Sequence, residues 1–224
     1  MEVDGAMLSG QTNPRRLCLA VIAAVVLYVV LDAVAQSLPP HYSPIRDAES
    51  DLAVGPFGYI MTMNFLNRGV FSLIFLYALS KAAQTDTASR SEGAATDLRL
   101  GTCIFGAWAV GAILLALFPT DVPATPISWH GAIHLIVAVL AFVGGSLGSL
   151  ILSLQFGKHP ALRGAKNPAL AVSILSVVLL FVGLSSLTSP VGGLTERLFL
   201  GSVLFWQVIT STYLATWTPV TRRM

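Results

Sequence analysis

The sequence has little charge and lacks the polar composition of a soluble domain. Of its 224 residues, 54% are hydrophobic and only 11% are charged, whereas charged residues make up about 25% of a typical soluble domain. The mean hydropathy is +0.75, so we predict an integral membrane protein. The formal net charge of +2 leaves no dense basic face, which excludes nucleic acid as a partner.

Cysteine is scarce as well. The chain has two cysteines, Cys18 and Cys103, which lie far apart in the sequence and outside any Cys-x-x-Cys motif. This content excludes both a disulfide framework and a structural zinc site built on cysteine.

Six apolar runs are long enough to cross a bilayer as helices, which takes about 20 mostly apolar residues. Segments rich in proline, glycine, serine or charge separate these runs. The sequence therefore predicts an all-α, polytopic six-transmembrane-helix bundle that forms one domain, residues 1–224, without a soluble domain. The predicted spans are residues 17–38, 57–79, 100–118, 129–154, 169–187 and 198–217.

Basic residues gather at one end of the predicted bundle. Lysine and arginine are retained on the cytoplasmic side of a membrane, so their position predicts that both termini are cytoplasmic. The opposite end has only Arg46 and Arg197. The basic residues of the predicted cytoplasmic end are Arg15, Arg16, Lys81, Arg90, Arg99, Lys158, Arg163, Lys166, Arg222 and Arg223.

The first span has an alternative interpretation. Arg15 and Arg16, the apolar run that follows them and the small residues Ala33-Val34-Ala35 also fit a signal peptide with its cleavage site. Cleavage there would leave five spans.

Ionisable and amide side chains within the spans are candidates for function, because they are costly in a bilayer unless they are paired or face a cavity. Arg68 lies near mid-membrane on the second helix, with Asn64 one turn above it. Asp32, His134 and Gln207 lie at similar depths on three other helices. We predict that these five side chains line a polar pocket open to the non-cytoplasmic face and that Asp32 pairs with Arg68. The alternative is that they only join helices.

His130 and His134 are spaced i, i+4 on the fourth helix, which lets two imidazoles bind one metal ion. Asp121 is a candidate third ligand, with Asp32 and Glu196 as alternatives. Because no His-Glu-x-x-His motif supports the pair, we expect no cofactor, with a bound divalent metal as the alternative.

Small residues on the fourth helix permit a close approach of another helix. They include Gly144, Gly145 and Gly148. The predicted contact lies either within the bundle or between two copies of the chain in a homo-oligomer.

The first outer loop is denser in charge than any other outer segment. Ser50 or Asp51 can cap a short helix that lies across the pocket, and a solvated loop is the alternative. The residues of this outer-loop motif are Arg46, Asp47, Glu49, Ser50 and Asp51.

Three segments carry a family resemblance: HYSPIRDAESDLAVGPFGYIMTMNF at residues 41–65, FPTD at residues 118–121 with the His130 helix after it, and GLTERLF at residues 193–199. They resemble an uncharacterised family of bacterial six-helix membrane proteins, domain of unknown function nine-nine-eight. The outer loop and the fourth helix are also similar, more distantly, to the autophagy-modulator and GPI-lipid-remodelling six-helix proteins, although this loop departs from their Ile-Ser-Asp-x-Gly motif. The resemblance implies six helices and an outward-facing site, without an established reaction.

Three functions follow from these patterns for a multi-pass protein of the cell (cytoplasmic) membrane. The first is an outward-facing pocket that binds a lipid or small amphiphile. The second is a membrane-embedded, metal-dependent lipid hydrolase or remodelling enzyme, in which His130, His134 and Asp121 bind the metal or act as general acid and base. The third is a structural or partner-binding subunit.

Overall fold

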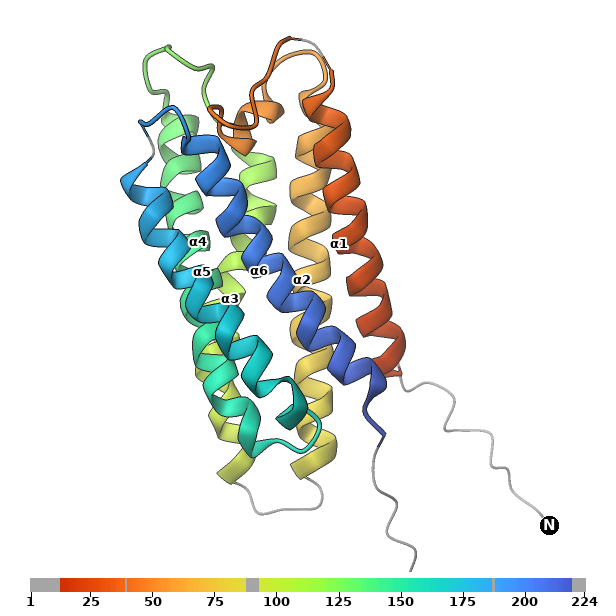
Figure 1. The fold of residues 1–224 in the computed structure, drawn as a ribbon. Coiled ribbons are helices and arrows are strands. Elements are labelled where there is room, and N and C mark those ends of the chain that lie inside the picture. The colour runs from red at the N-terminus through yellow and green to blue at the C-terminus, as the bar shows by residue number, and fades with distance from the viewer. Residues whose placement is uncertain (1–12, 39, 88–92, 187, 219–224) are drawn as a thin grey trace, which may run out of the picture.

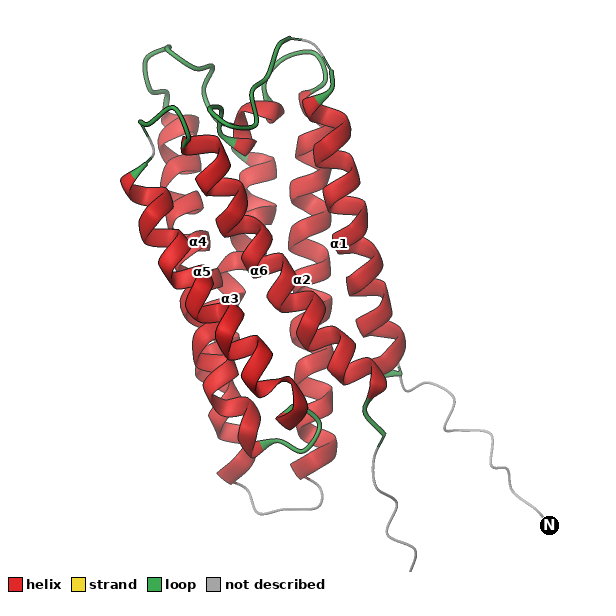
Figure 2. Cartoon of the chain, viewed as in Figure 1, coloured by secondary structure: helices red, strands yellow, loops and turns green. Residues whose placement is uncertain are grey.

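The computed structural model describes residues 13–38, 40–87, 93–186 and 188–218. Within these ranges the regular secondary structure is entirely helical, as Figure 2 shows. The long helices are α1 (Pro14–Gln36), α2 (Gly58–Thr87), α3 (Gly93–Leu117), α4 (Trp129–Gln155), α5 (Lys166–Ser185) and α6 (Gly192–Thr216).

Each of these six helices is long and apolar enough to cross a membrane. The predicted all-α, six-helix membrane architecture is therefore confirmed for the described part of the chain. The helix boundaries differ from the predicted spans by a few residues, and the predicted end of the fifth span at residue 187 lies outside the described residues.

The helices form a closed ring in chain order (Figure 1). Each helix packs against the next one, and α6 returns to pack against α1. Successive helices run in opposite directions, so the start of α1 and the end of α6 lie at one end of the bundle. A short 3₁₀ helix, η1 (Glu49–Ala53), lies at the opposite end.

The predicted orientation rests on the basic residues. Those that the structure describes lie at the end where α1 begins, while Arg90, Arg222 and Arg223 lie outside the described residues. The end that carries η1 is therefore the non-cytoplasmic end under the same prediction.

Side chains that bond to free backbone N–H groups define two of the helix starts. The Asn13 side chain accepts from the backbone N–H of Arg15 at 3.0 Å, and Pro14 takes the first helical position of α1. The Ser128 hydroxyl accepts from the backbone N–H of Gly131 at 3.1 Å and begins α4.

Glycines bring α4 unusually close to α3. A Cβ at Gly148 would lie 2.7 Å from Cα of Phe105, and one at Gly145 would lie 2.8 Å from the ring of Trp108. Gly144 likewise faces α3, where a Cβ would lie 2.8 Å from the Ile104 carbonyl oxygen. All three glycines therefore pack against a helix of the same chain, which is the first of the two contacts that the sequence predicts.

Aromatic rings fill the half of the interior that lies away from η1. Trp206 of α6 lies 5.4 Å from Phe75, 5.1 Å from Phe105 and 6.0 Å from Phe156, measured between ring centroids. Its indole N–H donates to the Ser153 hydroxyl at 2.8 Å. The buried side chains of Glu49, Arg68 and His134 lie in the other half, towards η1.

Candidate functional site

Arg68 of α2 lies inside the bundle with only 1% of its surface exposed. Its Nη1 atom is 3.7 Å from Oε2 of Glu49, which reaches down from η1. The Tyr28 hydroxyl of α1 donates to Oε1 of Glu49 at 2.6 Å and accepts from Nη1 of Arg68 at 3.3 Å. Three elements thus meet in a closed polar triangle.

The predicted pairing of Arg68 with Asp32 is wrong. Asp32 accepts from Gln36, one turn further along α1, at 2.5 Å. Helix α1 presents Tyr28 to Arg68 instead, and the outer loop supplies the anion. Depth along the helix placed Asp32 near Arg68, but depth does not fix which helix faces meet.

Aromatic rings surround the guanidinium group of Arg68. Its central carbon lies 4.6 Å from the centroid of a Trp108 ring, 5.2 Å from that of Phe65 and 5.8 Å from that of Tyr28. Its Nε and Nη2 atoms have no hydrogen-bond acceptor among the described residues. One carboxylate and three ring contacts therefore stabilise the buried charge.

Glu49 is held in place because the outer loop packs against the start of α6. The backbone N–H groups of Gly193 and Leu194 donate to the carbonyls of Arg46 and Ile45 at 3.2 and 2.9 Å. The Arg197 side chain donates to two further carbonyls of the same loop. The loop is therefore docked on the bundle, and it is not the freely solvated loop of the alternative prediction.

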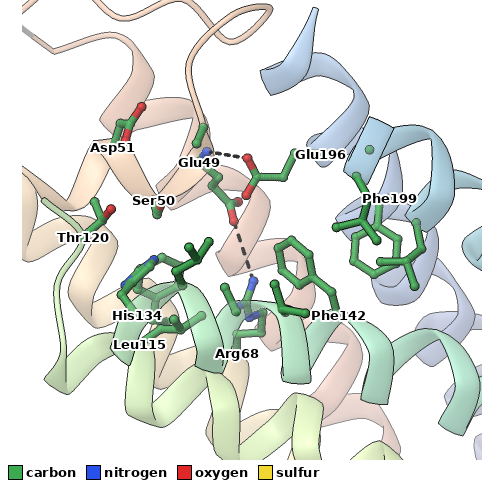
Figure 3. Close-up of a pocket in the computed structure, with 18 of the residues that line it drawn as sticks. Glu49, Ser50, Asp51, Arg68, Leu115, Thr120, His134, Phe142, Glu196 and Phe199 are labelled. Carbon is green, nitrogen blue, oxygen red and sulfur yellow. Dashed lines mark hydrogen bonds and ion pairs between the residues drawn. The ribbon is translucent and has the colours of Figure 1, made fainter. Parts of the chain in front are cut away.

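The short helix that was predicted across the pocket is present as η1. It begins at Glu49 after Ala48, and neither Ser50 nor Asp51 caps it. Oε2 of Glu196, on α6, accepts from the backbone N–H of Glu49 at 3.1 Å. Figure 3 shows this bond beside the ion pair of Glu49 with Arg68.

Burial governs the ionisation of the carboxyl groups in η1. It raises the pKa of Glu49 above its ordinary value, although the nearby Arg68 guanidinium opposes this shift. Burial also raises the pKa of Asp51. These carboxyl groups therefore hold a proton more readily than exposed ones do.

A cavity of about 250 Å³ lies between η1 and the helices below it. Its polar side chains come from η1, α2, α4 and α6 and from the segment between α3 and α4. These are Glu49, Ser50, Asp51, Arg68, Thr120, His134 and Glu196. Its apolar part is lined by Phe65, Leu115, Leu135, Ala138, Val139, Phe142, Leu179, Leu180, Leu184 and Phe199.

The apolar part of the cavity reaches the outer surface of the bundle between α4 and α5. Leu135, Val139 and Leu184 line the cavity and are nevertheless 55%, 38% and 39% exposed. Gly183 also lines it, and a Cβ there would meet no atom within 4 Å. In a membrane this surface faces lipid, so the cavity has an opening on the lipid side.

His134 lies at the cavity with 6% of its surface exposed. Its Nδ1 atom is 2.8 Å from the carbonyl oxygen of Phe118. A carbonyl only accepts, so we assign the proton to Nδ1. The other nitrogen, Nε2, then carries a lone pair, and it has no partner among the described residues.

The residues of the predicted metal site make other contacts. The Asp121 carboxylate accepts from the Ser128 backbone N–H at 2.9 Å and from its hydroxyl at 2.6 Å, and these bonds hold its pKa below the usual range. The His130 ring lies against that of Trp129. The described part of the chain contains no group of three His, Cys, Asp or Glu residues arranged to hold a metal ion, and a metal here stays a prediction.

The remaining predicted pocket residues join helices. Asn64 donates to the Tyr28 carbonyl at 3.0 Å, and Gln207 donates to the Ser72 hydroxyl at 3.2 Å. Neither they nor Asp32 line the cavity. Arg68 and His134 do, so the structure brings two of the five predicted pocket residues to one site.

Only some residues of the outer-loop motif line the cavity. Glu49, Ser50 and Asp51 line the cavity. Arg46 lies outside it with an exposed side chain, 4.0 Å from Asp47.

Sequence reasoning missed Tyr28 as a residue of the site. Tyr28 lies one turn before Asp32 on α1, and its aromatic side chain does not stand out in an apolar span. Glu196 was considered as a metal ligand but not as a partner of the outer loop, and it belongs to the GLTERLF segment at residues 193–199. That segment contacts the outer loop, and all three segments behind the family resemblance contribute residues to the cavity.

A ring of six membrane-length helices with ionisable groups buried near one end defines a polytopic integral membrane protein. The chain belongs to the family described as Protein of unknown function (DUF998), which matches residues 22–213. No curated protein and no solved structure matches the chain. The more distant similarity to autophagy-modulator and GPI-lipid-remodelling proteins therefore rests on the sequence motif alone.

Proposed function

We propose that this protein binds a lipid or other small amphiphile in the cavity beneath η1. The polar head group lies among the side chains of η1, α4 and α6, and the chain leaves between α4 and α5. The observation that carries this proposal is a single cavity that is polar at one end and apolar and open to the bundle surface at the other.

The size of the cavity supports partial enclosure of such a ligand. Its volume of about 250 Å³ is below the roughly 300–1,000 Å³ of pockets that enclose a drug-sized molecule. The cavity suits a head group and the first part of a chain. The rest of the chain lies in the bilayer, next to Leu135 and Leu184.

The orientation predicted from the basic residues puts the head group in the non-cytoplasmic leaflet of the cell membrane. η1 covers the head group from the aqueous side. The docking of the outer loop on α6 supports this role, because it fixes η1 over the cavity.

A leucine substitution at Gly183 tests the proposal. A Cβ at position 183 meets no atom within 4 Å, so Gly183→Leu adds bulk at the opening. Gly201→Leu is the matched control, because Gly201 on α6 also has no atom within 4 Å of a built Cβ and does not line the cavity.

The measurement is native mass spectrometry of purified protein released from lipid nanodiscs. We expect a retained lipid on the wild type and on Gly201→Leu, and a strong loss of it on Gly183→Leu. Equal retention by all three proteins, or no retained amphiphile on the wild type, would contradict the proposal and favour a purely structural or partner-binding subunit.

A further inference from the structure

We infer that the preferred ligand has a positively charged, hydrogen-bond-donating head group of the kind carried by a protonated long-chain amine. This inference rests on the proposed function and deepens it by naming the class of ligand.

The charge of the cavity lining supports a cation. Three carboxyl groups line the cavity, those of Glu49, Asp51 and Glu196, against the single guanidinium of Arg68. Arg68 also lines the cavity, but its charge is paired with that of Glu49 and its guanidinium group lies against the ring of Trp108. Beyond this ion pair, the lining residues Asp51 and Glu196 have no opposite charge in the cavity, so an anion entering it would meet an excess of carboxyl groups.

A second guanidinium at this end of the bundle is engaged elsewhere. Arg197 donates to the carbonyls of Pro44 and Asp47 and to the Tyr42 hydroxyl. Its side chain does not line the cavity. It moderates the negative charge of its neighbour Glu196 without offering a donor to a ligand.

The hydrogen-bond acceptors of the cavity lining also favour a cationic ligand. Oε2 of Glu196 accepts from η1, but its Oε1 has no donor among the described residues. Nε2 of His134 likewise has none, and its ring is more than nine-tenths buried. Both atoms are therefore free to accept a hydrogen bond from a ligand, and an ammonium group supplies three donors.

Aromatic rings complete the environment of a cation. Phe65, Phe142 and Phe199 line the cavity, and the last two rings lie 4.9 Å apart between centroids. Ring faces attract cations, most strongly where water is excluded. The same rings give no such attraction to a phosphate or a carboxylate.

The test compares three probes that share one alkyl chain: tetradecylamine, tetradecanol and tetradecyl phosphate. Native mass spectrometry of the purified full-length protein, titrated with each probe in a neutral detergent, gives a Kd for each. We expect the amine to bind about tenfold more tightly than the alcohol, which corresponds to about 1.4 kcal/mol. The phosphate should bind more weakly than the alcohol.

The outcomes separate the two proposals. If the phosphate binds as tightly as the amine or more tightly, the inference about the head group is wrong while the cavity remains an amphiphile site. If none of the three probes binds, the proposed function itself fails. These results come from the wild type and do not depend on any variant folding.

The variant Glu196→Gln then tests whether the amine head group binds beside Glu196. Glutamine keeps an oxygen that can accept from the Glu49 backbone N–H, so η1 keeps its bond to α6. We expect Glu196→Gln to weaken the amine about tenfold and to leave the alcohol unchanged. Asp32→Asn is the control, since it makes the same charge change outside the cavity. An equal effect of both variants would overturn the assignment of the site.

Discussion

Gly148→Ala would place a methyl group 2.5 Å from the backbone nitrogen of Phe105 and 2.7 Å from its Cα. Backbone atoms cannot rotate away as a side chain can, so α3 and α4 would have to separate. Overpacking of this kind costs about 1–3 kcal/mol. The better helix propensity of alanine returns about 0.5–1 kcal/mol, and we expect a net loss of up to about 2.5 kcal/mol in the free energy of unfolding.

Gly201→Ala is the same substitution where the structure leaves free space. No atom lies within 4 Å of a Cβ built at Gly201. Only the gain in helix propensity applies there, so we expect this variant to be more stable than the wild type by about 0.5–1 kcal/mol. The two substitutions should therefore have opposite signs.

Reversible unfolding by sodium dodecyl sulfate in mixed micelles, followed by far-ultraviolet circular dichroism, measures both values. Equal stability of the two variants would refute the close contact between α3 and α4. The oligomeric state of Gly148→Ala, measured by native mass spectrometry, tests the alternative role of the glycines. Dissociation of a dimer without a loss of monomer stability would show that they pack between two chains.

Three further predictions address the carboxyl groups, the start of α4 and the orientation. Because burial raises the folded-state pKa of Glu49 above its ordinary 4.5, the wild-type free energy of unfolding should fall as the pH rises from 4.5 through that pKa. Glu49→Gln should flatten this dependence, and identical pH profiles would contradict the shift. Ser128→Ala removes the cap of α4 and should cost about 1 kcal/mol in the same unfolding assay, whereas an unchanged value would argue against the cap. In a variant without its native cysteines, Thr125→Cys should react with an impermeant maleimide from the non-cytoplasmic side and Arg163→Cys only after permeabilisation. The reverse pattern would invert the predicted orientation.

The six helices could be predicted from the sequence because length and hydropathy are nearly sufficient to define a membrane span. The need of Arg68 for a partner was also predictable, since a charge at mid-membrane is costly unless it is paired. The identity of that partner was not. Glu49 lies in a loop, and only the tertiary structure brings its side chain down between the helices.

The rest of the cavity depends on contacts between distant segments. The backbone of Glu49 bonds to Glu196, which is 147 residues away, and no local pattern predicts such a pairing. The spacing of His130 and His134 suggested a metal site, yet Nδ1 of His134 bonds to a backbone carbonyl and Asp121 bonds to Ser128, the residue that caps α4. Residue types and spacing identified candidates, but they could not show which hydrogen bonds each candidate already makes.

The polar triangle has a consequence for how the chain enters the membrane. A lone arginine at the centre of a helix adds about 2.5–3.5 kcal/mol to the cost of insertion by the translocon. Tyr28 and Glu49 precede Arg68 in the sequence, so both partners have left the ribosome before α2 is complete. Glu196 is synthesised much later. The charge of Arg68 can therefore be neutralised early in biogenesis, whereas η1 gains its attachment to α6 only when the last helix has been inserted.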